Sequence, residues 1–157
     1  MASKGRDAAA GLRARVQAFV RGFGLLREAT TPCGQPVALS HAHALSVLLS
    51  RREVPGATRH KDLADALGLD KSSVARLCRR MEAAGHVRQT AAEGDGRARD
   101  VTLTTKGVRL AEAIEAASQE RFRRVLRSIP HAERLRVLTA LDSLNAAIAS
   151  LEPGVDA

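Results

Sequence analysis

The amino-acid sequence predicts a mainly α-helical fold with one small β-hairpin, an α+β class. Three observations support this prediction. Apolar residues recur at helical spacing in several separate segments, and two stretches with a period of two flank a loop that is rich in glycine. The length of 157 residues, with 45% hydrophobic and 27% charged residues, is typical of one globular domain over residues 1–157.

The first part of the chain is expected to hold a loose arm, a helix, a loop and a second helix. Small and polar residues at 1–10 are typical of a terminal arm. Apolar spacing predicts a helix over about residues 12–28, and the two prolines and one glycine of residues 30–36 then predict a loop. Ser40 is expected to cap the next helix, which covers residues 41–52.

Two shorter helices joined by a tight turn are expected to follow. Helical spacing covers residues 61–67, and Gly68 has the position of a helix-terminating glycine. Asp70 can accept hydrogen bonds from the first backbone amides of the next helix, and its negative charge suits the positive end of that helix. This second helix extends to about Ala84, and Gly85 ends it.

A β-hairpin is expected after these helices. Residues 87–91 and 100–104 alternate with a period of two around a loop at 93–99. The order of helix, tight turn, helix and basic hairpin is that of a winged helix-turn-helix, in which the hairpin is the wing. This lobe is expected to cover about residues 40–105.

Two long helices complete the chain. Thr104 or Thr105 can cap the first of them, Pro130 interrupts it, and leucines at near-heptad spacing predict a final helix beyond that proline. The helices at about 10–30 and 106–151 carry more leucine, valine and phenylalanine than one small lobe can cover. Exposed apolar stripes of this size usually have a partner, so these segments are expected to be dimerisation helices.

The second helix of the helix-turn-helix has two chemically different faces at about 100° per residue. Its inward face is expected to consist of Val74, Leu77, Cys78 and Met81. Its outward face carries arginine, which presents a planar donor fork to guanine, and serine, which bonds to bases or phosphates in a DNA major groove. The residues expected near bases are Lys71, Ser72, Ser73 and Arg76, and those expected at phosphates are Arg79 and Arg80.

The tip of the hairpin carries Arg97 and Arg99 beside flexible glycines. An arginine in this position can enter a DNA minor groove, where narrowing deepens the negative potential. Asp95 would repel DNA if its charge were free, so it is expected to orient an arginine through an ion pair. The alternative is that Asp95 bonds to its own backbone as a turn residue.

The charge balance favours a polyanionic partner. The chain has 25 Lys and Arg against 17 Asp and Glu, a net charge of +8, and a sequence pI near 10.9. Three phenylalanines, without tryptophan or tyrosine, exclude the aromatic platforms on which proteins stack single-stranded bases. Duplex DNA is therefore the expected partner.

Other functional classes have little support in the sequence. No nucleophile elbow or phosphate loop is present, so the chain is not expected to be an enzyme. No apolar run approaches the roughly 20 residues of a membrane span, and the first residues do not resemble a signal peptide, so a cytoplasmic location without membrane contact is expected.

The two cysteines are too few for a disulfide framework or a four-ligand zinc site, and neither a metal nor a cofactor is expected. Cys33 falls in the predicted loop, where an exposed thiolate could respond to oxidants. Cys78 falls on the apolar helix face and is expected to be a small core residue.

The helix-turn-helix and the wing together resemble the MarR-type transcriptional regulators. The matching segments are DLADALGLDKSSVARL at 62–77 and MEAAGHV at 81–87. The wing is similar to the family pattern D-x-R followed by L-T-x-x-G, with DGR at 95–97 and VTLTTKG at 101–107. The resemblance implies that Arg97 is the minor-groove arginine and that Asp95 is its wing partner.

The same resemblance implies an obligate homodimer whose first and last two helices interlock and whose two lobes read a pseudo-palindromic operator. It also implies release of the DNA by a small apolar or phenolic effector. A homodimeric DNA-binding repressor is therefore the leading hypothesis. Two alternatives remain: a thiol-based redox regulator of the same fold that senses through Cys33, and a winged-helix module that binds an acidic protein.

Overall fold

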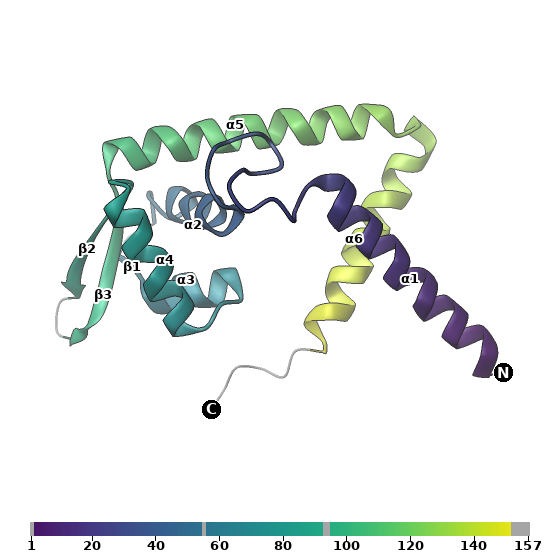
Figure 1. Cartoon of the computed structure of the whole chain (residues 1–157), viewed down its shortest axis with the longest axis horizontal. Coiled ribbons are helices and arrows are strands. Elements are labelled where there is room, and N and C mark those ends of the chain that lie inside the picture. Colours follow the sequence, from purple (N-terminus) through teal and green to yellow (C-terminus); the bar gives the residue numbers. More distant parts are fainter. Residues whose placement is uncertain (1, 55, 93–94, 152–157) are drawn as a thin grey trace. The chain divides into compact units, whose positions relative to one another are not determined.

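The computed structural model describes residues 2–54, 56–92 and 95–151, with the side chains of residues 2–6 and 95–97 outside that description. Along the chain the elements are α1 (Ala2–Phe23), α2 (Leu39–Ser50), β1 (Thr58–Arg59), α3 (His60–Leu67), α4 (Lys71–Ala83), β2 (Val87–Ala92), β3 (Asp95–Leu103), α5 (Thr105–Ser128) and α6 (His131–Ala149). The predicted fold class, mainly helical with a small β-hairpin in a winged helix-turn-helix lobe, is confirmed (Figure 1). No helix among the described residues has both the length and the apolar character needed to cross a membrane.

The wing is part of a small antiparallel sheet with the strand order β1-β3-β2. Val87 pairs with Leu103 at the base of the β2–β3 hairpin, and Thr58 of β1 pairs with Val101 on the other side of β3. The sheet therefore ties the start of α3, which follows β1 directly, to the wing. Figure 1 shows the hairpin beside α3 and α4, in agreement with the packing of α4 against β2.

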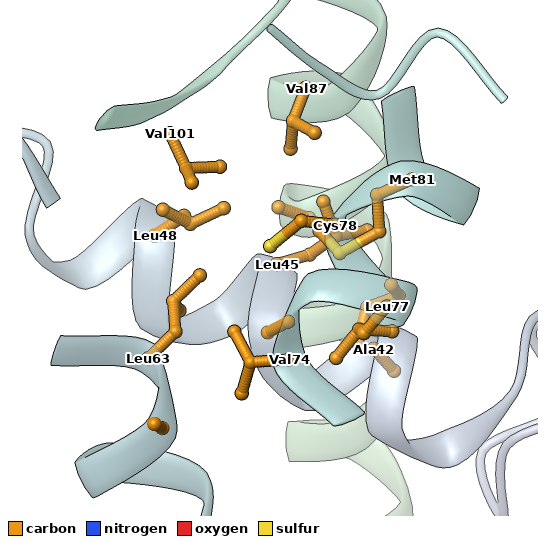
Figure 2. Close-up of a cluster of buried hydrophobic side chains, with 14 residues drawn as sticks. Ala42, Leu45, Leu48, Leu63, Val74, Leu77, Cys78, Met81, Val87 and Val101 are labelled. Carbon is orange, nitrogen blue, oxygen red and sulfur yellow. The ribbon is translucent and has the colours of Figure 1, made fainter. Parts of the chain in front are cut away.

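The core of the lobe lies between α2, α3, α4, the sheet and the first half of α5. Its buried members come from all of these elements, and Leu45, Leu63 and Val74 are fully buried. Figure 2 shows side chains of α2, α3 and α4 converging with Val87 and Val101 of the sheet. The apolar face of α4 is thus held by the core, as the sequence predicts. The buried set is Ala42, Ala44, Leu45, Leu48, Leu63, Ala64, Val74, Leu77, Cys78, Met81, Val87, Val101, Ala111 and Ile114.

By its contacts the chain forms two compact units, residues 1–118 and 119–157. In the second unit, α6 has no buried residue among those described. Most of its large apolar side chains are exposed, as are several on the last part of α5 and on α1 of the first unit. These exposed side chains include Leu12, Val16 and Phe19 of α1, Phe122, Val125 and Leu126 of α5, and Leu135, Leu138, Leu141 and Ile148 of α6.

Two predictions about the N-terminal segment are wrong. Residues 2–10 are helical and belong to α1, because alanine favours the helix more strongly than the small, polar character of the segment opposes it. The helix also ends at Phe23, five residues early, where Gly24 adopts a φ of +85°, a left-handed conformation that favours glycine.

Three other boundaries differ from the prediction. The N-cap of α2 is Ala38, without a side-chain hydrogen bond, and Ser40 lies inside the first turn rather than capping it. Strand β3 begins at Asp95, so part of the predicted loop is extended. The two-residue strand β1 was not predicted, because a pairing so short leaves no periodic pattern in the sequence.

Candidate nucleic-acid interface

Helix α4 begins at a strong side-chain cap. Asp70 Oδ1 accepts the backbone N–H of Ser73 at 2.9 Å and the hydroxyl of Ser72 at 2.6 Å, while Oδ2 accepts the hydroxyl of Ser73 at 2.6 Å. These hydrogen bonds, the one from Ser72 first, hold the pKa of Asp70 well below its usual range. Since both hydroxyl protons point to Asp70, the two serines can offer oxygen lone pairs to a ligand without breaking the cap.

The outward side of α4 carries an arginine face, which consists of Arg76, Arg79 and Arg80. All three side chains are exposed, and so are Lys71 and Ser72, whereas Ser73 is half-buried. Ser73 Oγ accepts a hydrogen bond of 3.0 Å from Arg76 Nη2, which holds this guanidinium near the start of the helix. Within the part of the chain that the structure describes, no carboxylate forms an ion pair with the arginine face. Its positive charge is therefore available to a polyanion.

The wing contributes Arg99, whose side chain is exposed on β3. Asp95 and Arg97 also belong to β3, but their side chains lie outside the described residues. The ion pair expected at Asp95 and the groove contact expected of Arg97 therefore remain predictions.

A hollow lies between the first residue of α3, the helix α4 and the wing. We call it the wing hollow, and its lining consists of His60, Ala75, Arg79, Glu82, Gln89 and Arg99. Glu82 Oε1 accepts the backbone N–H of Gln89, and Glu82 Oε2 accepts its side-chain amide, each at 2.8 Å. Gln89 Oε1 in turn lies 2.8 Å from His60 Nε2. A continuous chain of hydrogen bonds thus joins α4, β2 and α3.

Sequence reasoning missed His60, Glu82 and Gln89. Their contacts join residues that lie seven and 29 positions apart in the chain. No local spacing marks such a contact, because it depends on how the wing folds back onto α3 and α4. The one available sign was the polar Gln89 within the predicted strand.

Two histidines meet on the inner side of the lobe. His41 Nε2 of α2 lies 3.0 Å from His86 Nδ1 in the turn between α4 and β2, with the rings edge to face. Burial, then His86 and Arg80, lowers the pKa of His41 from 6.5 to about 4. Burial and the charge of Lys106 also lower the pKa of His86. Both imidazoles are therefore neutral near pH 7, with one N–H between them.

We expect the free energy of unfolding to fall as the pH is lowered from about 6.5 to 4. In this window the unfolded chain takes up a proton at His41 while the folded chain resists it, so stability present above pH 6.5 is lost on acidification. The loss is about 1–2 kcal/mol after allowance for the partial exposure of the ring. Urea unfolding at a series of pH values measures it.

The variant His41→Gln should flatten this pH dependence between pH 6.5 and 4. The matched control is His43→Gln, because His43 is on the same helix but is exposed. A wild-type profile that His41→Gln leaves unchanged contradicts the prediction.

Both cysteines are free thiols. Cys33 is half-buried in the loop after α1, and its Sγ lies 3.0 Å from Thr31 Oγ1. Cys78 is fully buried in the core, where burial and the charge of Glu82 raise its pKa to about 11. The described residues include no group of three or more His, Cys, Asp or Glu that could hold a metal ion.

The winged helix-turn-helix lobe is similar to a known protein family. Residues 38–98, which run from the N-cap of α2 into the wing, match the model of the MarR family. The resemblance to the MarR-type regulators is thereby confirmed over these residues. The comparison with curated protein sequences gave no match.

Solved structures of MarR-type regulators share the fold. The PcaV transcriptional regulator from Streptomyces coelicolor has a TM-score of 0.69 at 17% identity, over 91% of this chain and 98% of PcaV. The MepR–DNA complex of Staphylococcus aureus has a TM-score of 0.63 at 17% identity, over 91% and 94%. In BpsR of Bordetella bronchiseptica, DNA binding is regulated by 6-hydroxynicotinic acid. Its structure has a TM-score of 0.63 at 20% identity, over 87% of this chain and 91% of BpsR. The fold of the MarR regulators therefore extends over most of this chain.

Proposed function

We propose that this chain is a homodimeric, sequence-specific transcriptional regulator that binds duplex DNA. Helix α4 enters the major groove, the wing arginine Arg97 enters the minor groove, and a small apolar or phenolic ligand releases the DNA. The observation that carries the proposal is the arginine face, which is exposed and not neutralised by a described carboxylate. It lies on a firmly capped helix beside the wing. MepR, which has the same fold, has been solved in complex with DNA, and this supports DNA as the partner.

Dimerisation is supported by the exposed apolar side chains of α1, of the last part of α5 and of α6. Apolar side chains so numerous on one small chain usually pack against a partner. A two-fold dimer would also place two α4 helices on half-sites about 10 base pairs apart. We therefore assign about residues 10–30 and 106–151 to dimerisation within a single MarR-like domain.

The ligand part of the proposal is supported by BpsR, because the DNA binding of that protein is regulated by the small molecule 6-hydroxynicotinic acid. The thiol-responsive alternative would act through Cys33, and treatment with peroxide followed by the DNA-binding assay tests it. Neither reading involves catalysis by this chain.

Arg76→Ala and Arg97→Ala are each expected to weaken DNA binding by roughly 10- to 100-fold, because a well-placed arginine contact is worth about 1–3 kcal/mol. The DNA is selected by the purified protein from random oligonucleotides, and fluorescence anisotropy measures the affinity. The control is Arg136→Ala on α6, an exposed arginine that pairs with Glu133. Affinity should also fall with salt, with a slope of about 0.9 per phosphate contact on logarithmic axes.

No binding of DNA at low salt contradicts the proposal and favours the acidic-protein alternative. Unchanged binding after Arg97→Ala overturns the assigned minor-groove contact. Sedimentation equilibrium of the same preparation tests the dimer, and a monomer at micromolar concentration overturns that part.

A further inference from the structure

The lining of the wing hollow includes two permanent cations, the carboxylate of Glu82 and one imidazole. Arg79 and Arg99 are exposed on its lining, and His60 is half-buried beside them. We propose that the wing hollow binds a backbone phosphate of the DNA and that His60 donates a hydrogen bond to it when protonated. DNA affinity then rises as the pH falls. This inference rests on the proposed function.

The hydrogen bonds in the hollow fix which nitrogen of His60 carries the proton. An ionised carboxylate accepts hydrogen bonds and cannot donate them, so both contacts of Glu82 require N–H groups of Gln89. The amide of Gln89 therefore turns its NH₂ group to Glu82 and its oxygen to His60. Because that oxygen is an acceptor, the proton of the neutral imidazole is on Nε2 of His60.

This assignment leaves Nδ1 of neutral His60 with a lone pair, which cannot bond to a phosphate oxygen. Protonation converts Nδ1 into a second donor and adds a positive charge, and imidazole is the side chain that makes this change between pH 5 and 8. The bond from Nε2 to Gln89 persists in both states. Protonation therefore adds a hydrogen-bond donor and a positive charge at His60, while the hydrogen bonds that join His60, Gln89 and Glu82 remain.

The charges around His60 determine the sign of the effect. Arg79 and Glu82 face it from α4, Arg99 and Asp100 come from the wing, and Arg59, Lys61 and Asp62 flank it in its own segment. Two of the three carboxylates accept hydrogen bonds, Glu82 from Gln89 and Asp62 from the backbone N–H of Arg59, whereas Asp100 Oδ1 accepts none and lies 3.8 Å from Arg59 Nε, an ion-pair distance. A phosphate between Arg79 and Arg99 adds a negative charge, which favours protonated His60. DNA binding and proton uptake are thus coupled.

The test compares DNA affinity at pH 6, 7 and 8 at constant ionic strength. We expect the wild-type protein to bind its selected DNA roughly tenfold more tightly at pH 6 than at pH 8. His60→Gln retains an N–H donor for Gln89 but cannot be charged, so its affinity should stay near the wild-type value at pH 8. His43→Gln, in which an exposed histidine of α2 is replaced, should behave as wild type.

A pH dependence that persists in His60→Gln overturns the inference and leaves the proposed function standing, whereas absence of DNA binding at every pH overturns the proposed function itself. If His60→Gln does not fold, NMR titration of the wild-type imidazoles replaces it. Added DNA should then move the titration midpoint of His60 to higher pH, and no movement overturns the inference. An equal movement with inorganic phosphate alone assigns the hollow to free phosphate and also overturns it.

Discussion

Replacement of Gly107 by alanine is expected to destabilise the lobe by about 3 kcal/mol. Gly107 is buried in the first turn of α5, where an added Cβ would overlap the backbone carbonyl oxygen of His86. That carbonyl cannot easily move away, because it accepts the backbone N–H of Thr104 at 3.0 Å and the Thr104 hydroxyl at 3.2 Å. The methyl group therefore separates the start of α5 from the turn that precedes the wing.

Urea unfolding followed by circular dichroism measures this loss. Wild type and variant are compared at one protein concentration, since dimerisation would make the midpoint depend on concentration. The matched control is Gly22→Ala in α1, because no side chain and no backbone beyond its own helical turns lies within 4 Å of the added Cβ, its two chain neighbours aside. That change should leave stability unchanged or raise it by up to about 1 kcal/mol. Equal midpoints for Gly107→Ala and wild type would contradict the prediction, because they would show that the turn at His86 accommodates the added methyl group without loss of stability.

The sequence predicts such features well where the signal is local. Gly68 ends α3 with a φ of +61°, Asp70 caps α4, and Thr104 Oγ1 accepts the N–H of Gly107 at 3.0 Å at the start of α5. Each depends on residues within four positions of one another, and each appears in the sequence as a recognised residue type. The prediction at Ser40 was wrong because a good capping residue does not fix where the preceding loop lets a helix begin.

The candidate site likewise has one part that local patterns predict and another part that they do not. Periodicity alone identified the outward arginines of α4, since a helix with one buried face must expose the other. The wing hollow could not be predicted, because Gln89 reaches Glu82 and His60 only after the hairpin has folded against α3 and α4. Local patterns therefore predict which residues are outward, whereas the pairing of distant elements determines which of them act together.

Replacement of Leu45 by alanine is expected to cost about 3–4 kcal/mol, a large part of the stability of an ordinary domain. Leu45 has 0% exposure and lies in the middle of the cluster that Figure 2 shows, where α2 meets α4. Truncation removes its transfer free energy and leaves a cavity against Cys78 and its neighbours. Because the inner face of α4 rests on this cluster, the support of the arginine face weakens with it.

Two further variants separate the cavity from a general effect of substitution. Leu45→Met conserves the volume and should cost less than about 1.5 kcal/mol. Val54→Ala removes apolar atoms from a side chain that is 58% exposed and lies outside the segments assigned to dimerisation, so it should change stability by less than about 0.5 kcal/mol. Chemical unfolding measures all three variants under the same conditions. If Leu45→Ala costs no more than Val54→Ala, the packing of α2 against α4 does not determine the stability of the lobe, and the arginine face must be held by the cap at Asp70 and by the wing instead.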